Sequence, residues 1–242
     1  MTSALVTGGS RGIGRAIVER LARDGASVVF SFESNEGAAA EVVAAVRAGG
    51  GRAFAVQADQ GSSADLRRLA EEAERQLGGV DVLVCNAGIN PPVGMLDATE
   101  EDFDRVMAVN AKGPFFLMQL VGRKLPDGGR IINISSLSTA IPVPGSSLYV
   151  GSKAALEQFT AVAAREFGGR GITVNCVSPG ATDTDLLRTA NPGQTFEETK
   201  AFTALQRLGE PADIANVVAF LAGPDSGWIT GQNLRVTGGM LL

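Results

Sequence analysis

One tyrosine and one lysine, four residues apart, are the side chains of this sequence best suited to acid–base chemistry. Tyr149 is the only tyrosine among 242 residues, and Lys153 follows it in the stretch LYVGSK. Residues four apart share one face of a helix, so we expect the phenol and the ammonium to be neighbours. A neighbouring cation stabilises phenolate and lowers a tyrosine pKa from its usual value of about 10, towards the pH at which general acid–base catalysis is efficient. The alternative is an exposed Tyr–Lys pair with no chemical role.

The rest of the composition argues against several other kinds of site. The chain has no histidine and two cysteines, Cys85 and Cys176, each inside an apolar run. We therefore expect no metal site and no histidine-based triad, and we expect both cysteines to be reduced core residues. The net charge is −5 and basic residues form no cluster, which argues against a nucleic-acid partner.

The sequence also bears on location. No apolar run approaches the ~20 residues of a membrane span. The first strand-like run begins at Ser3, which leaves no room for a signal peptide. We therefore expect a cytoplasmic protein without a membrane partner.

Alternating apolar runs and helical segments predict how the reactive side chains are positioned. Runs that are apolar on both faces alternate with helices, which is typical of a parallel sheet covered on each side. We predict an α/β fold: a single Rossmann-type domain over residues 1–242, with a doubly wound parallel sheet of seven strands and helices on both faces. The predicted strands are 3–7, 26–32, 52–59, 80–88, 128–136, 171–180 and 232–239, and the predicted helices lie within 11–25, 34–50, 62–78, 99–124, 148–169 and 211–223.

The first predicted strand ends in a glycine-rich turn, TGGSRGIG, that runs into a helix. Glycines allow the backbone to approach a phosphate, and a helix N-terminus offers free N–H groups and a partial positive charge. A plain tight turn is the alternative, because the glycine spacing differs from G-x-G-x-x-G. The candidate cofactor-binding residues of this turn are Gly8, Ser10, Arg11, Gly12, Ile13 and Gly14.

The end of the second predicted strand bears on which dinucleotide binds. NAD sites usually place an acid there, but Phe32 occupies that position and Glu33 is expected to face the other way. Arg11 could pair with a 2′-phosphate, and Ser34 and Asn35 could add hydrogen bonds. This pattern favours NADP(H) over NAD(H), although Arg11 could instead be a solvated surface residue.

Polar or glycine residues also follow the other predicted strands, at the edge where an open α/β sheet binds its ligand. Such residues can hold an adenine edge, a ribose or a nicotinamide, or they can cap turns. Their recurrence after strand upon strand indicates a site rather than a set of isolated turns. The further candidates are Asp59, Gln60, Asn86, Ala87, Gly88, Ser136, Pro179, Gly180, Thr182 and Thr184.

In their order and spacing, these motifs resemble those of the short-chain dehydrogenase/reductase family along the whole chain. Within that family the sequence is most similar to the 3-oxoacyl-[acyl-carrier-protein] reductases of fatty acid biosynthesis. The matching motifs are TGGSRGIG, NAG (86–88), Asn110, Ser136, YVGSK (149–153) and PGATDT (179–184).

The resemblance implies a role for each matching residue. Tyr149 would be the general acid or base, and Lys153 would tune it and bind the nicotinamide ribose. Ser136 would hold the substrate oxygen, Asn110 would belong to a water relay, and Thr184 would contact the nicotinamide amide. Pro114 has no N–H to give to the carbonyl of Asn110, so we expect that carbonyl to hold a water that reaches Lys153; a packing kink is the alternative.

The function that follows is an NADPH-dependent reductase that transfers hydride to the carbonyl of a 3-oxoacyl thioester or a related ketone. An NAD(P)-dependent alcohol or sugar dehydrogenase of the same family and a non-catalytic dinucleotide-binding module remain open. Acyl carrier protein is a candidate partner, because Arg170 occupies one position where the resemblance implies a docking cation. Asp127 occupies another such position, which leaves room for a free ketone substrate.

Two segments concern assembly and substrate access. The helical stretch SKAALEQFTAVAAREF is apolar nearly all round, and residues 240–242 form an apolar tail. With the resemblance, these features imply a homotetramer with two-fold interfaces; a helix fully buried within a monomer is the alternative. Residues 185–206 follow Thr184 and are expected to form irregular short helices that act as a substrate lid.

Overall fold

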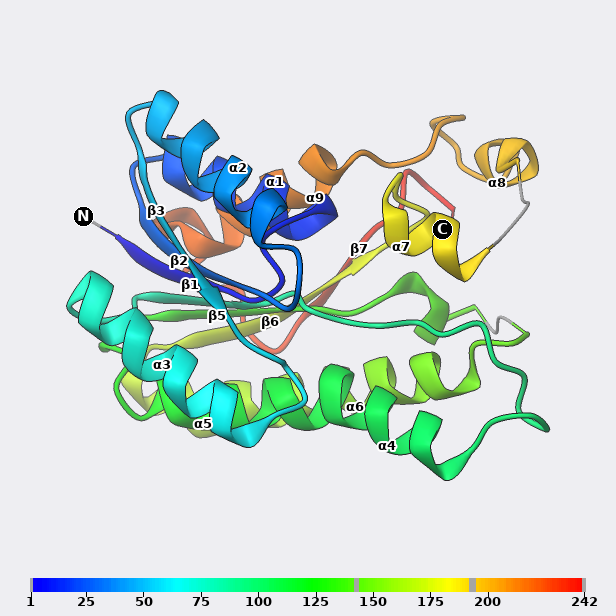
Figure 1. The fold of residues 1–242 in the computed structure, drawn as a ribbon, viewed down its shortest axis with the longest axis horizontal. Coiled ribbons are helices and arrows are strands. Elements are labelled where there is room, and N and C mark those ends of the chain that lie inside the picture. Colours follow the sequence, from blue (N-terminus) through cyan, green and yellow to red (C-terminus); the bar gives the residue numbers. More distant parts are fainter. Residues whose placement is uncertain (1, 142–143, 192–194, 241–242) are drawn as a thin grey trace.

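A computed structural model describes residues 2–141, 144–191 and 195–240 (Figure 1). Seven parallel strands form one sheet in the order β3-β2-β1-β4-β5-β6-β7, which confirms the predicted fold. The order changes direction between β1 and β4, the place where open α/β sheets bind ligands. The strands are β1 (Ser3–Val6), β2 (Ser27–Phe32), β3 (Arg52–Gln57), β4 (Val82–Cys85), β5 (Arg130–Ile134), β6 (Thr173–Pro179) and β7 (Asn233–Val236).

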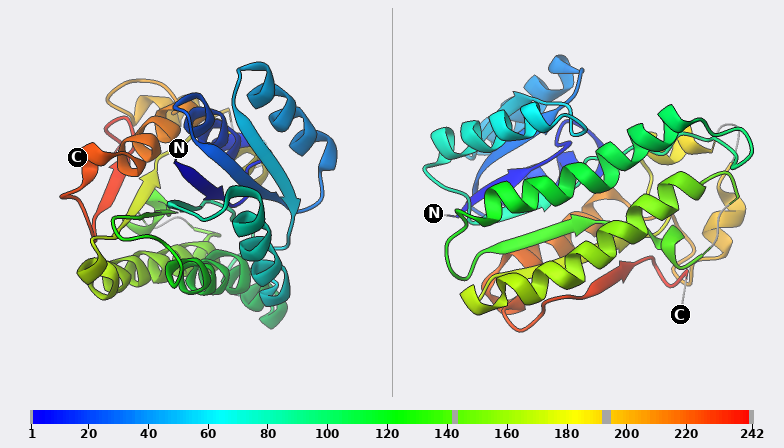
Figure 2. Two further views of the ribbon diagram at one scale, coloured as in Figure 1. Left: turned by 90° about the vertical axis from the view of Figure 1, so that its left-hand side faces the viewer. Right: turned by 90° about the horizontal axis from the view of Figure 1, so that it is seen from below.

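Helices cover both faces of the sheet (Figure 1). On one face lie α1 (Gly12–Arg23), α2 (Glu36–Ala48) and α9 (Pro211–Ala222). On the other lie α3 (Ser63–Leu77), α5 (Gly113–Gly122) and α6 (Ser147–Phe167), which run beside one another in Figure 2.

Side chains alternate between these two layers, which explains why the strands read as apolar throughout. In β1, Ala4 and Val6 pack into the core shared with α1 and α9, whereas Leu5 packs into the core beneath α5. All three are completely buried. Cys85 and Cys176 are buried as well, as predicted, and burial raises the pKa of each thiol to about 12.

Every strand except β2 ends earlier than predicted at the edge that carries the polar residues. The prediction extended the fourth strand over 80–88, but β4 ends at Cys85. The N–H groups of Asn86 and Ala87 both donate to the hydroxyl of Thr7 at 3.0 Å instead of to a neighbouring strand. The chain is therefore free to turn away from the sheet at the residues expected to bind a ligand.

The helical region predicted at 99–124 is confirmed, with an interruption at its centre. It consists of α4 (Glu100–Met107), a π-helical turn η1 (Ala108–Lys112) and α5. The π turn places the Gly113 N–H on the carbonyl of Ala108. Pro114 cannot donate to the carbonyl of Asn110, so a regular α-helical bond is missing at this point. Single π turns of this kind are frequent at functional sites.

Residues 185–206 contain two short helices, α7 (Asp185–Ala190) and α8 (Glu197–Ala201), as predicted. Residues 192–194 of this segment lie outside the described residues, as do Leu241 and Leu242 of the apolar tail.

The surface bears on assembly. Val162 of α6 is 55 % exposed, so the alternative of a helix fully buried within one chain is wrong. Phe115 and Phe116 on α5 are partly exposed, and the only tryptophan, Trp228, is completely exposed. The tetramer itself stays a prediction.

Across the described ranges, no helix is long and apolar enough to cross a membrane, and no group of His, Cys, Asp or Glu is arranged to hold a metal ion.

Candidate active site

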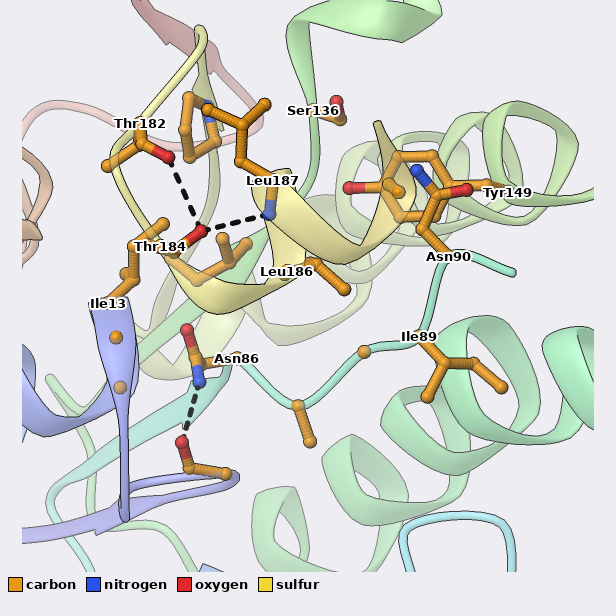
Figure 3. Close-up of a pocket in the computed structure, with 18 of the residues that line it drawn as sticks. Ile13, Asn86, Ile89, Asn90, Ser136, Tyr149, Thr182, Thr184, Leu186 and Leu187 are labelled. Carbon is orange, nitrogen blue, oxygen red and sulfur yellow. Dashed lines mark hydrogen bonds between the residues drawn. The ribbon is translucent and has the colours of Figure 1, made fainter. Parts of the chain in front are cut away.

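A cavity of about 450 Å³ opens where the strand order changes direction, at the carboxyl ends of the strands. Most of the predicted site residues line it, and Figure 3 shows several of them around the opening. Asn110, Ser34 and Asn35 are not among the described residues that line it. Those that do are Gly8, Ser10, Arg11, Gly12, Ile13, Gly14, Asp59, Gln60, Asn86, Ala87, Gly88, Ser136, Tyr149, Lys153, Pro179, Gly180, Thr182 and Thr184.

The glycine turn is locked by its own sequence. Gly8 has a φ of +67°, which favours glycine, and an added Cβ at Gly14 would lie 2.0 Å from the Gly8 carbonyl oxygen. The Asn86 amide donates to the carbonyls of Thr7 and Gly8 at 2.9 and 3.1 Å, and Figure 3 draws one hydrogen bond from this amide. These contacts present the N-terminus of α1 to the cavity. The N-cap residue of α1 is Arg11, and its side chain makes no capping hydrogen bond within the described ranges. The turn is therefore suited to a phosphate.

Gln60 provides a second sign that a ligand belongs in the cavity. Its side chain is buried, and neither amide atom has a hydrogen-bond partner within the described part of the chain. Buried amides are seldom left unpaired, because the lost hydrogen bonds to water cost about 1–3 kcal/mol. Both amide atoms are closed off from the cavity, so they would meet the edge of a base such as adenine only after the side chain turns. The glycine turn and the N-terminus of α1 fit the phosphates of a dinucleotide.

The end of β2 differs from the prediction in two ways. Ser34 and Asn35 do not reach the cavity, because Asn35 caps α2 by accepting from the Ala38 N–H at 2.9 Å. Glu33 was expected to face away, and this is wrong: it lines the cavity. The strand ends at Phe32, so alternation of side chains no longer applies at the next residue.

Arg105 of α4 neutralises the acids at this end of the cavity. Its guanidinium donates to Asp59 at 2.8 and 3.0 Å and to Glu33 at 2.8 Å. The sequence motifs did not point to Arg105, because it lies inside a helix 46 residues from Asp59. A carboxylate next to a cofactor phosphate would repel it, and Arg105 offsets that charge.

Arg11 is exposed and within reach of Asp185, with 3.8 Å between Nη1 and Oδ2. Exposed pairs of this kind contribute little stability, so Arg11 can leave Asp185 for a stronger anion. We expect Arg11→Ala to weaken NADPH binding about 10-fold or more, since a charge-assisted bond to the 2′-phosphate would be lost, with little change for NADH. Titration of cofactor fluorescence measures both dissociation constants. Asp185→Asn is the control and should bind NADPH at least as tightly as wild type; equal losses for NADH and NADPH would contradict the role of Arg11.

Tyr149 and Lys153 share one face of α6, as their spacing predicted. Lys153 Nζ lies 5.8 Å from the centroid of the Tyr149 ring and donates to the carbonyl of Ile134 at 2.8 Å. Ser136 follows β5 and accepts from the Ser138 N–H at 3.2 Å, which fixes its hydroxyl at the start of the short helix η2 (Leu137–Thr139). Figure 3 shows Ser136 and Tyr149 at the cavity. An acid, a hydrogen-bond donor and a cation are thereby gathered in one place.

The pKa of Tyr149 differs from the expectation. Burial raises it above its ordinary value, and the neighbouring Ser136 hydroxyl acts in the opposite direction. The expected lowering by Lys153 is not found, and burial dominates because the phenolate would lose its solvation. Burial also lowers the pKa of Lys153 to about 8. The phenol thus keeps its proton at neutral pH, which is the form that an acid needs.

These shifts set the expected pH dependence of carbonyl reduction. Below a pH of about 8 Lys153 is charged and Tyr149 protonated; above it Lys153 loses its proton. We therefore expect kcat/KM, which reports the free enzyme, to be level at lower pH and to fall as the pH rises through about 8. Glu157 favours the charged form of Lys153, whereas the thiols of Cys85 and Cys176 stay neutral in this range because burial raises the pKa of each to about 12. Rates of NADPH oxidation from pH 6 to 10 check this, and a rate that climbs between pH 7 and 9 would contradict it.

Asn110 lies just behind the cavity wall and is completely buried. Its side chain accepts from the Ile89 N–H at 2.9 Å and donates to the Ile89 carbonyl at 2.8 Å and to Ser152 Oγ at 3.0 Å. An added Cβ at Gly88 would lie 3.2 Å from Lys153 Nζ and 3.3 Å from Asn110 Oδ1. Asn110 therefore holds the chain segment beside Lys153. The water relay through its carbonyl stays a prediction.

Sequence reasoning missed the residues of the cavity that do not belong to a motif. Asn90 lines it, and its buried Oδ1 has no partner within the described ranges. The apolar part of the lining comes from separate loops and short helices. These segments are too short to show the hydrophobic periodicity from which buried positions can be predicted. The apolar lining includes Leu137, Ile141, Leu186, Leu187, Phe196 and Met240.

The strand order, the glycine turn and the paired Tyr149 and Lys153 define a Rossmann-type protein with a dinucleotide site. A family model described as "Enoyl-(Acyl carrier protein) reductase" matches residues 8–241. A hydroxynaphthalene reductase-like protein, Arp2, from Metarhizium brunneum is 42% identical over 249 residues, covering 98% of this chain and 93% of its own. The chain belongs to the short-chain dehydrogenase/reductase family.

Two solved structures are similar over nearly the whole chain. A blue fluorescent protein from a metagenomic library, in complex with NADPH, is 45% identical with a TM-score of 0.94, covering 100% of this chain and 98% of its own. The angucycline C-6 ketoreductase LanV with bound NADP is 44% identical with a TM-score of 0.93, covering 99% and 95%. None of these three relatives is named as a 3-oxoacyl reductase, so that narrower resemblance stays a prediction.

Proposed function

We propose that this chain is an NADPH-dependent ketoreductase. The observation that carries the proposal is the gathering of Ser136, Tyr149 and Lys153 in the same cavity as the glycine turn. The similar structures that contain NADPH or NADP, one of them a ketoreductase, support both the cofactor and the reaction.

The residues of the chain divide the work between binding and proton transfer. The glycine turn and the N-terminus of α1 hold the pyrophosphate, and Arg11 holds the 2′-phosphate. When bound, NADPH supplies the hydride that reduces the carbonyl carbon. Ser136 donates a hydrogen bond to the carbonyl oxygen as negative charge develops there, and Tyr149 gives that oxygen its proton. Lys153 offsets the charge left on the phenol.

The apolar lining indicates the class of ketone. Leu137, Ile141, Leu187 and Phe196 line the cavity that holds Tyr149, and Asn90 adds a polar side chain to the same lining. An apolar pocket with few polar groups suits a ring-bearing ketone better than a sugar. The hydroxynaphthalene reductase-like relative and the angucycline ketoreductase are named for ring-bearing compounds.

A 3-oxoacyl thioester is the second candidate substrate; the description of the matching family model supports a carrier-protein thioester, although it names an enoyl group and not a 3-oxoacyl group. Docking of acyl carrier protein through Arg170 finds no support, because its guanidinium is engaged within the chain. It pairs with Asp127 at 3.1 Å and donates to the carbonyls of Gly122, at 2.8 Å, and of Leu125. Arg170 also follows the far end of the 21-residue helix α6, which at 1.5 Å per residue is about 30 Å from the end that carries Tyr149.

Residues 185–206 act as the lid over this pocket in our proposal. Leu186 and Leu187 of α7 and Phe196 beside α8 contribute to the lining, so movement of these helices would change the shape of the substrate space. We propose in addition that the enzyme is a homotetramer, with the exposed phenylalanines of α5 at an interface.

A substrate panel tests the proposed function. NADPH oxidation is followed with a bicyclic aromatic ketone, acetoacetyl thioesters with and without carrier protein, and small aliphatic and sugar ketones. We expect kcat/KM to be highest, by about 10-fold or more, for the bicyclic ketone, because it buries the most apolar area. A higher kcat/KM for the carrier-protein thioester would contradict the ring-bearing ketone and identify the thioester as the substrate class. NADPH binding without turnover of any carbonyl would favour the non-catalytic module instead.

A further inference from the structure

Glu157 of α6 lies one helical turn beyond Lys153, whose charge it favours, and takes no direct part in the hydride or proton transfer described above. Its Oε1 accepts from the hydroxyl of Ser135 at 2.6 Å and from that of Thr139 at 2.8 Å, and Ser178 Oγ lies 3.3 Å away. A partly buried carboxylate loses solvation, and several hydroxyl donors on one oxygen replace it. The arrangement therefore makes the carboxylate the centre of a local network.

The network includes residues before and after Ser136 in the chain. Ser135 precedes it, and Thr139 ends η2, the short helix whose N-cap residue is Ser136. The Thr139 hydroxyl lies between the carbonyl oxygen of Ser136, at 2.9 Å, and Glu157 Oε1. Glu157 thus fixes the two ends of the turn that carries Ser136.

Within this turn, one of the hydrogen bonds of the Ser136 hydroxyl is already made. Its oxygen accepts from the Ser138 N–H at 3.2 Å, which leaves its proton for another acceptor. A substrate carbonyl oxygen is such an acceptor, because Ser136 lines the cavity. A shift of the turn would move this donor, and small displacements of a positioned group can lower a rate about 100-fold.

The network also reaches β6. Ser178 precedes Pro179 and Gly180, which line the cavity, and its hydroxyl lies 2.7 Å from Asn233 Oδ1 and 3.3 Å from Glu157 Oε1. One carboxylate oxygen therefore contacts the ends of two neighbouring strands, β5 and β6, at the cavity. Glu157 itself is not among the described residues that line the cavity, so it can act only through its neighbours.

We propose that Glu157 is a positioning residue for Ser136: its carboxylate holds the turn Ser135–Thr139 so that the Ser136 hydroxyl meets the substrate oxygen in the transition state. The proposal rests on the proposed ketoreductase function, because it requires a carbonyl that is reduced. It does not require Glu157 to bind NADPH.

Three variants test the proposal on the full-length protein. Glu157→Gln keeps an acceptor oxygen and should lower kcat about 10-fold; Glu157→Leu removes all three contacts and should lower it about 100-fold. KM and the NADPH dissociation constant, measured by fluorescence, should stay within about 3-fold of wild type, since the contacts matter most in the transition state. Glu166→Gln, an exposed acid farther along α6, is the matched control and should leave kcat unchanged.

A double-mutant cycle separates positioning from a purely structural role. In a Ser136→Ala background, Glu157→Leu should have less than about a 3-fold effect on kcat, because the group that it positions is gone. The same loss of kcat in both backgrounds would overturn the proposal, and so would a fall in melting temperature with kcat intact. If wild type reduces no carbonyl of the panel, the proposed function and this inference fall together. If wild type is active and Glu157→Leu keeps full activity, only this inference falls.

Discussion

Replacing Tyr149 by phenylalanine is expected to lower kcat for carbonyl reduction about 1,000-fold while NADPH still binds. The substitution removes only the phenolic oxygen, and positioned general acids contribute about 100- to 10,000-fold to a rate. Burial keeps the phenol protonated, so the group that is lost is a proton donor in its active form. The absence of histidine from the sequence leaves few side chains able to take over.

Two measurements check this result: steady-state NADPH oxidation gives kcat, and cofactor fluorescence gives the dissociation constant. Ser146→Ala is the control, because Ser146 lines the same cavity just before Tyr149 and its side chain does not cap α6. That variant should retain nearly full activity. A Tyr149→Phe protein with more than a tenth of the wild-type kcat would refute the assignment of the acid.

Replacing Gly14 by alanine is expected to abolish detectable NADPH binding at concentrations that saturate wild type. The new Cβ would lie 2.0 Å from the Gly8 carbonyl oxygen and 2.5 Å from the Asn86 amide nitrogen. Neither neighbour can move freely, because Asn86 clamps the turn. The turn must therefore open, and overpacking of this kind costs about 1–3 kcal/mol of folding stability as well.

Thermal unfolding and a fluorescence titration of the same protein separate the two effects. Gly168→Ala is the matched control, because Gly168 has a φ of −57° and open space around its Cβ position. It should bind NADPH like wild type, with a melting temperature equal or slightly higher. Normal NADPH affinity in Gly14→Ala would show that the turn does not cradle the cofactor.

The parts of the fold that follow from local chemistry could be predicted from the sequence. Apolar runs identified every strand of the sheet, and the spacing of Tyr149 and Lys153 placed both on one face of α6. The predicted end of the fourth strand lay beyond the observed one. The N–H groups of Asn86 and Ala87 donate to the Thr7 side chain, and nothing in the sequence near residue 86 indicates that contact.

What the sequence could not provide are relations between distant residues. Arg105 meets Glu33 and Asp59 only once the fold is formed, and Glu157 meets Ser135 in the same way. The direction of the Tyr149 pKa shift was wrong for a related reason. Spacing indicates that a cation is near, but it does not reveal how much water the phenol loses on burial.

The full exposure of Trp228 has a practical consequence. An indole surrounded by water emits at long wavelength whether the chain is folded or not, so intrinsic fluorescence should report poorly on unfolding of an isolated chain. The same indole becomes a sensitive probe when another surface covers it, because its emission then moves to the blue. With a single tryptophan in the sequence, any such colour change on concentrating the protein can be assigned to one place on the molecule.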